Sequence, residues 1–222
     1  MIRIAARAGT IIGLALALLI QGCAADKALV KSEFPTTTPI TAVHRQTRPF
    51  VVLTFGKVVA GATLGVLLSG GLGAGLMVSA LSSGDSEEGR QLLGPLDFGH
   101  MVKKRFIERA ASEIPNWPGD QLKVIEVPIG SEEQIEAPSM LEFKAGWMFN
   151  SWRIIADADV ELRARPQGDP IWRKMVRYNG SDYGRSHSWD EFRAEDGKLL
   201  KEEMEFAIDT IVSAMLKHFR GE

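Results

Sequence analysis

The architecture of this chain is set by Leu141-Glu142-Phe143-Lys144-Ala145-Gly146-Trp147-Met148-Phe149-Asn150, in which every second side chain from Leu141 onward is apolar. The pattern returns from Ile154 to Arg165, where apolar residues alternate with acids and arginines. Alternation of this length is typical of antiparallel strands with one buried face and one face in water. The two stretches therefore predict neighbouring antiparallel strands whose charged side chains lie in water.

Further strands are expected around this pair. Residues 166–170 contain two prolines and a glycine and predict a turn into a third strand at 171–178. Short apolar runs at 50–55 and 122–127 are bounded by proline or glycine and predict two more strands. The sheet is therefore expected to be mostly antiparallel.

Helix signals occupy the remaining segments. Asp97 can cap a helix with an apolar stripe, and residues 98–114 carry that stripe. Ser188 and Glu191 form a capping box that opens a short helix, and a closing helix is expected from about 198 to 219. The sequence thus predicts an α+β fold, a two-layer domain with helices packed on one face of the sheet.

The first 22 residues have the parts of a signal peptide. Arg3 and Arg7 precede an apolar stretch, 11–20, that is too short to cross a bilayer as a helix. Cys23, the single cysteine of the chain, stands just beyond this stretch. A lone thiol in an exported protein indicates a specific use for it. The alternative is an ordinary signal segment with an incidental thiol.

The residues before Cys23 resemble the lipobox of bacterial lipoproteins; they are Leu19, Ile20, Gln21 and Gly22. In that family the cysteine is diacylated, becomes the first residue after cleavage, and is acylated again on its new amine. The resemblance therefore implies a covalent lipid at Cys23 as the only cofactor. Ala24 stands where the family's inner-membrane retention signal places an aspartate. The resemblance thus implies an outer-membrane anchor, with the domain facing the periplasm.

Residues 58–81 carry no charged side chain and are rich in glycine. Small residues recur at every fourth position, in one row of Gly61, Gly65, Ser69 and Gly73 and a second row that includes Gly71 and Gly75. Such rows let helices pack closely in a membrane, and they also allow self-association. The length suffices for a spanning helix, but a hairpin broken at Gly70-Gly71 agrees better with an anchor at Cys23. A glycine-rich insert in the domain is the alternative.

These features divide the chain into six parts. Prolines and threonines between the anchor and residue 49 favour a flexible connection there. The expected parts are a signal peptide (1–22), an anchor and tether (23–48), a first strand (49–57), the glycine-rich membrane segment (58–81), a polar linker (82–96) and the remainder of the domain (97–222).

No residues have the spacing of a catalytic or metal site. The net charge of −2 disfavours nucleic acid as a partner, because no broad basic field exists. The four histidines lie in unrelated segments, whereas zinc needs three or four ligands. Asp157 and Asp159 share a strand face with Glu161 and Arg163, which favours a solvated charged surface over a catalytic carboxylate pair. We therefore expect no enzymatic activity; His187 is the residual candidate for a hydrolase.

The order of the expected elements resembles the small domain of ABC-transport auxiliary lipoproteins and the amino-terminal domain of the Tol-Pal translocation protein. The resemblance covers roughly residues 49–220 and rests on the 50–55 run and on the strand with Trp172 that leads to the long last helix. The insert at 58–81 departs from that pattern. The resemblance implies a non-enzymatic docking, assembly or transport-accessory subunit whose partners are membrane lipid and an envelope protein.

The expected partner surface is the charged face of the sheet, which consists of Asp157, Asp159, Glu161 and Arg163, with Trp172 nearby. A glycan- or lipid-binding module is the alternative function. It would use the tryptophans and a groove between the sheet and the helices.

Overall fold

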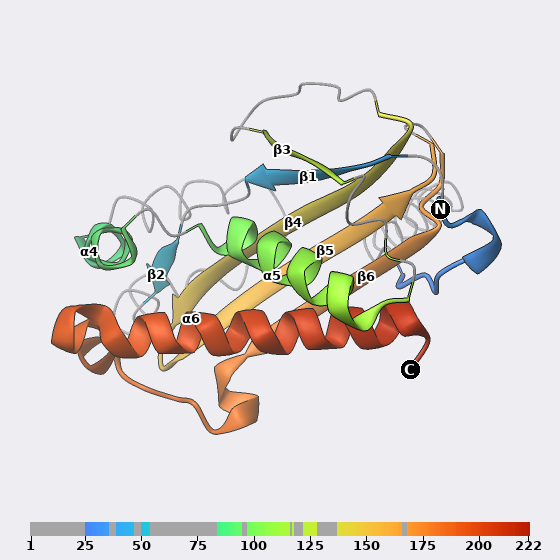
Figure 1. The fold of residues 1–222 in the computed structure, drawn as a ribbon. Coiled ribbons are helices and arrows are strands. Elements are labelled where there is room, and N and C mark those ends of the chain that lie inside the picture. Colours follow the sequence, from blue (N-terminus) through green and yellow to red (C-terminus); the bar gives the residue numbers. More distant parts are fainter. Residues whose placement is uncertain are drawn as a thin grey trace, which may run out of the picture.

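The computed structural model describes residues 25–35, 39–46, 50–53, 84–94, 97–115, 117, 122–127, 137–165 and 168–222. The expected signal peptide, Cys23 with its lipobox, and the glycine rows of 58–81 lie outside these residues. The described part forms an α+β domain in which helices pack on one side of a mixed six-stranded sheet (Figure 1).

The sheet has the strand order β3-β1-β4-β5-β6, and β2 also pairs with β4. The strands are β1 (Ile40–Gln46), β2 (Val51–Leu53), β3 (Lys123–Val127), β4 (Ser139–Asn150), β5 (Arg153–Arg163) and β6 (Trp172–Asn179). The two alternating stretches are confirmed as an antiparallel pair, because Leu141 of β4 faces Leu162 of β5 and Phe149 faces Ile154. β6 pairs with β5 in the antiparallel sense as well.

The expectation of a mostly antiparallel sheet is wrong. β1 runs parallel to both β3 and β4, and β2 runs parallel to β4. β1 lies within residues 23–48, which the sequence assigned to a flexible tether. Ile40, Ala42 and Val43 are fully buried there. Because the consecutive residues Ala42 and Val43 are both buried, both faces of β1 are covered, and a strand covered on both faces shows no period-two alternation.

The expected polar linker 82–96 is also a misassignment, since it contains helix α4 (Gly84–Leu93). Only a narrow side of α4 is buried, formed by Ser86, Gly89 and Leu93. The Ser86 hydroxyl accepts the Val52 amide at 2.8 Å, which attaches α4 to β2. Because α4 buries so few apolar side chains, its sequence lacks the apolar stripe that predicts a helix.

The predicted helix ends are confirmed. Helix α5 (Phe98–Glu113) begins at Asp97, whose carboxylate accepts the His100 amide at 2.7 Å. Ser188 and Glu191 form the capping box of α6 (Trp189–Arg220), and Gly221 ends that helix with a φ of 82°. Non-helical angles at 194–197 separate a short first helix from the long one, as the sequence indicated.

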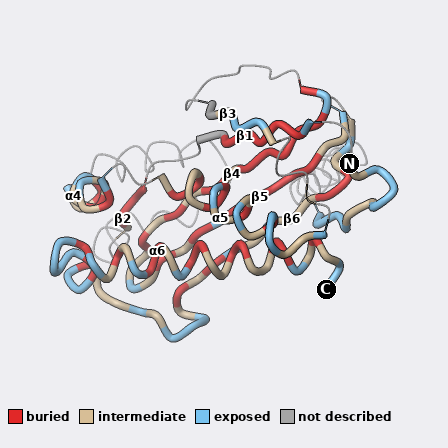
Figure 2. Tube along the Cα trace, viewed as in Figure 1, coloured by how far each residue is buried: buried red, intermediate tan, exposed pale blue. Residues whose placement is uncertain are grey.

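The core lies between the sheet and helices α5 and α6 (Figure 2). The apolar stripes of both helices are buried against β4, β5 and β6; they include Val102, Phe106, Leu200, Met204, Ile208, Ile211 and Met215. Arg105 of α5 forms ion pairs with Glu205 and Asp209 of α6 along the outer seam. Apolar packing therefore joins the two helices to the sheet, and the ion pairs join α5 to α6.

Candidate functional site

The charged sheet face predicted as the partner surface is a self-paired network. Arg173 forms ion pairs with Asp159 and with Glu161, the latter at 3.1 Å between Nη1 and Oε1. Arg163 pairs with Glu161 at 2.6 Å. The Glu161 side chain is only 6% exposed, so the expectation that this face lies wholly in water is wrong there.

The network stabilises the charged form of Glu161. Burial raises the pKa of this carboxyl, but the hydrogen bond from Arg163 and the charge of Arg173 outweigh burial, and the pKa lies below its ordinary value. Asp157 is the accessible member of the predicted surface; half of its side chain is exposed and it pairs with Arg177 at 2.7 Å. Charges already neutralised by neighbours offer less to a partner than unpaired charges.

Trp172 does not belong to a surface. Its side chain is fully buried on the opposite face of the sheet, where it packs against Phe106 and Phe219. Its indole Nε1 donates a hydrogen bond to His218 Nδ1 at 3.0 Å. The structure therefore removes Trp172 from the predicted partner surface and assigns it to the core.

Of the tryptophans considered as binding groups, only Trp152 is accessible. It lies at the turn between β4 and β5 and is 58% exposed, whereas Trp147 and Trp189 are each 7% exposed. Tyr183, in the 3-10 helix η4 (Gly180–Tyr183), and Phe206 are also exposed, and their rings meet edge to face with centroids 5.6 Å apart. We call these three exposed residues, Trp152, Tyr183 and Phe206, the distal aromatic patch; Tyr183 and Phe206 are in contact, and Trp152 is connected to them through the loop after η4.

The distal aromatic patch lies where β6 ends. The backbone of His187, in the loop after η4, donates to the carbonyl of Trp152 at 2.7 Å, which joins that loop to the β4–β5 turn. The Arg185 guanidinium carbon lies 4.4 Å from the centroid of the Phe206 ring, a cation–π contact. Tyr183, Phe206 and Arg185 could not be predicted as surface residues of one site, since nothing in their spacing shows that a loop and a helix meet.

A buried polar cluster around Glu203 lies behind the distal aromatic patch. Glu203 is fully buried and accepts hydrogen bonds from the Tyr178 hydroxyl and from Arg185. Burial, followed by the bond to Glu203, raises the pKa of Tyr178 above its ordinary range. The Tyr178 phenol therefore stays protonated and donates to Glu203, and the positive charge of Arg185 balances the buried Glu203 carboxylate.

Along the first half of β6, the chain enters the fold almost immediately after Cys23. The Asp26 carboxylate bonds Lys174 at 2.5 Å and the Met175 amide at 2.9 Å. Lys27 exchanges backbone hydrogen bonds with Arg173 at 2.9 and 3.0 Å, so this segment extends the sheet along β6. The expected tether is therefore a part of the fold from Asp26.

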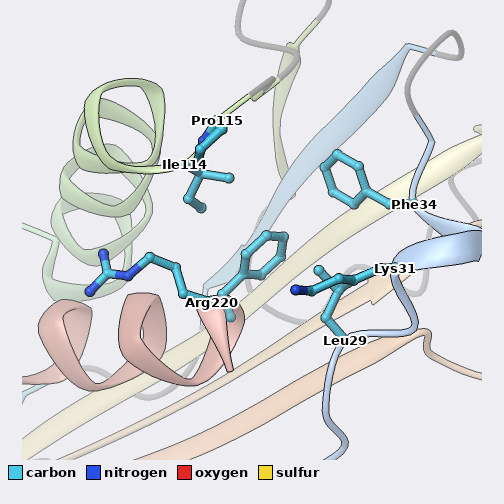
Figure 3. A pocket seen from close by; sticks show the side chains of 7 residues that line it. Leu29, Lys31, Phe34, Ile114, Pro115 and Arg220 are labelled. Atoms are coloured by element: carbon cyan, nitrogen blue, oxygen red, sulfur yellow. The ribbon is translucent and has the colours of Figure 1, made fainter. Parts of the chain in front are cut away.

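A cavity of about 450 Å³ opens beside this entry segment. Its walls come from the region around the 3-10 helix η1 (Lys31–Glu33) and from the carboxyl ends of α5 and α6 (Figure 3). The lining residues are Leu29, Lys31, Phe34, Ile114, Pro115, Phe219 and Arg220. Phe34 and Phe219 meet edge to face at 5.8 Å, and the Trp117 ring lies within 6.4 Å of both.

The described residues contain no cluster of potential metal ligands. His187 Nδ1 lies 3.9 Å from Glu191 Oε1, and the ring packs against Phe192. The nearby Asp182 carboxylate accepts a hydrogen bond from the Asn179 side chain. In that same described part, no helix combines the length and apolar character needed to cross a membrane.

Comparisons of the chain with protein-family models, curated proteins and solved structures find no match. The resemblance to envelope lipoproteins therefore rests on the sequence features alone.

Proposed function

We propose that this protein is a lipid-anchored envelope protein whose α+β domain acts as a non-enzymatic docking or transport-accessory subunit. The observation that carries the proposal is the attachment of residues 26–30 to β6. Asp26 is three residues after Cys23, a distance of about 10 Å at full extension. A lipid on Cys23 would hold the free edge of β6 near Asp26 close to the membrane surface.

The distal aromatic patch is the surface that we propose for the partner. Asp26 is bonded to Lys174 and Met175 in the middle of β6, and four residues, roughly 13 Å of strand, separate Met175 from the end of β6 beside the patch. Exposed tryptophan, tyrosine, phenylalanine and arginine are the residue types enriched in protein interfaces. The patch is therefore a better docking surface for an envelope protein than the self-paired charged face.

Photo-crosslinking in intact envelopes tests the docking proposal. A photoreactive residue placed beside the patch should capture a discrete protein, and the changes Trp152→Ala and Tyr183→Ala should abolish its capture. Val124→Ala is the matched control, because Val124 is 50% exposed on the distant strand β3. Capture that survives both patch variants, or that yields only the protein itself, contradicts the proposal.

The anchor is tested separately by mass spectrometry of the mature protein. The expected form begins at Cys23 and carries acyl chains, and Cys23→Ser should remain unmodified. An uncleaved or unacylated chain would refute the lipid anchor while leaving the docking test intact.

A lipid-binding module is a second candidate, because the structure contains a cavity with mostly apolar walls. The two roles are compatible, since the cavity and the distal aromatic patch lie at opposite ends of β6.

A further inference from the structure

The cavity between η1, α5 and α6 has the dimensions of a ligand site. Its volume of about 450 Å³ falls within the range of roughly 300–1,000 Å³ typical of small-molecule pockets. Three segments far apart in the sequence form it, so the space exists only in the folded chain. Figure 3 shows Phe34 and Ile114 on opposite sides of the space.

The walls select an apolar ligand. The five uncharged lining residues are all apolar: Leu29, Phe34, Ile114, Pro115 and Phe219. None of them presents a side-chain hydrogen-bonding group that could recognise a sugar ring. An aliphatic chain would remove apolar surface from water on both sides of the contact, which favours its binding.

The two cations of the lining differ in their availability. Arg220 donates to Glu113 at 2.6 Å and to both carboxylate oxygens of Glu222, and its guanidinium points away from the cavity (Figure 3). Within the described residues, Lys31 has no carboxylate partner. Its side chain is exposed and extends across the opening toward the end of α6 (Figure 3). Lys31 is therefore the cation free to meet an anion at the rim.

We infer that this cavity binds a fatty-acyl chain whose anionic head group pairs with Lys31. The apolar walls take the hydrocarbon, and the ammonium at the rim fixes the polar end. The chemistry of the ligand follows from the lining alone. The membrane as the source of the ligand rests on the proposed anchor, which would bring the cavity to the lipid surface.

The test uses the full chain purified in a mild detergent and a fatty acid with a photoreactive group in its hydrocarbon. Digestion and mass spectrometry should locate the adducts on Leu29, Phe34 or Ile114. Lys31→Glu should lower the labelling about tenfold, the effect of losing one charge-assisted hydrogen bond. The methyl ester of the same fatty acid should label the unchanged protein about as weakly.

Lys217→Glu is the matched control, because Lys217 is exposed near the same helix end but does not line the cavity. Ile114→Trp should block labelling by filling the space. If that variant does not fold, the exposed Lys31→Glu change still decides the question. Adducts elsewhere on the chain, or equal labelling of the Lys31→Glu variant, would overturn the inference.

Comparison of the anchored protein with Cys23→Ser identifies the occupant. Equal labelling of both supports a separate anionic lipid. Labelling confined to Cys23→Ser means that the anchor's own acyl chains fill the cavity and overturns the proposal of a separate ligand. Labelling of a chain that mass spectrometry shows to be unacylated refutes the anchor alone and leaves the cavity assignment standing.

Discussion

Asp26 and Lys174 lie 148 residues apart in the sequence, yet Asp26 Oδ2 is 2.5 Å from Lys174 Nζ. The second oxygen of the same carboxylate accepts the Met175 amide at 2.9 Å. A few residues further on, the Val30 amide donates to the carbonyl of Ile171 at 3.0 Å. These bonds attach the residues that follow Cys23 to the free edge of β6, where they form one wall of the apolar cavity.

Acid should release this entry segment. Burial raises the pKa of Asp26, but the bonds from Lys174 and Met175 outweigh it, so the pKa lies below the ordinary value of 3.8. A carboxyl whose pKa is lower in the folded state stabilises that state fully above its ordinary pKa. The contribution disappears as the pH falls from about 5 through the lowered pKa. The protection of the Val30 amide against hydrogen exchange, taken relative to the intrinsic rate at each pH, should therefore fall in acid.

Asp26→Asn provides the comparison for that measurement. This variant should exchange faster at neutral pH and lose most of the acid dependence at Val30. The same acid dependence in both proteins would show that another carboxyl controls the segment.

Removal of the buried carboxylate of Glu203 should destabilise the domain. Glu203→Leu leaves the buried Tyr178 hydroxyl without its acceptor and separates Arg185 from its counter-charge. We expect a loss of about 3 kcal/mol in the free energy of unfolding, measured by urea denaturation. Glu202→Gln changes the exposed neighbour and should alter stability by no more than about 0.5 kcal/mol. Equal effects of the two substitutions would contradict the role of the cluster.

Tyr178 should resist ionisation in alkali. Its pKa is raised above the ordinary value of 10.0 by burial and by the bond to Glu203. A folded-state pKa above the unfolded value stabilises the fold below pH 10, and this stabilisation is lost as the pH rises toward the raised pKa. The chain has two tyrosines, so Tyr183→Phe leaves Tyr178 as the only phenol. Ultraviolet titration of that variant should show ionisation only together with unfolding; a separate earlier transition would disprove the buried assignment.

Gly99 should not tolerate a side chain. A Cβ at this position would lie 2.2 Å from His44 Nε2, because α5 and β1 approach closely there. Gly99→Ala should destabilise the domain by about 1–3 kcal/mol in thermal or urea unfolding, as other overpacked sites do. Gly84→Ala is the control, since a Cβ on Gly84 would meet nothing within 4 Å and alanine favours a helix. A stabilising Gly99→Ala would mean that His44 can move aside.

The antiparallel core and the helix ends could be predicted from the amino-acid sequence. Leu141 and Leu162 belong to strands whose alternating pattern is local, and the Ser188–Glu191 capping box involves groups only three residues apart. Such signals need no distant partner, because period-two alternation and end capping are properties of a short stretch of chain. The resemblance of residues 19–22 to a lipobox is also a local signal, and the lipid anchor stays a prediction.

The folded chain alone reveals the parallel pairing of β1, the entry of Asp26 onto β6, the burial of Trp172 and the cavity at Phe34. Each depends on groups separated by tens to more than one hundred residues, and no pattern in one segment encodes which distant segment covers it. Trp172 is an example of this dependence on distant segments. An aromatic side chain on a strand is equally suited to a surface or a core, and the packing of α5 and α6 assigned it to the core.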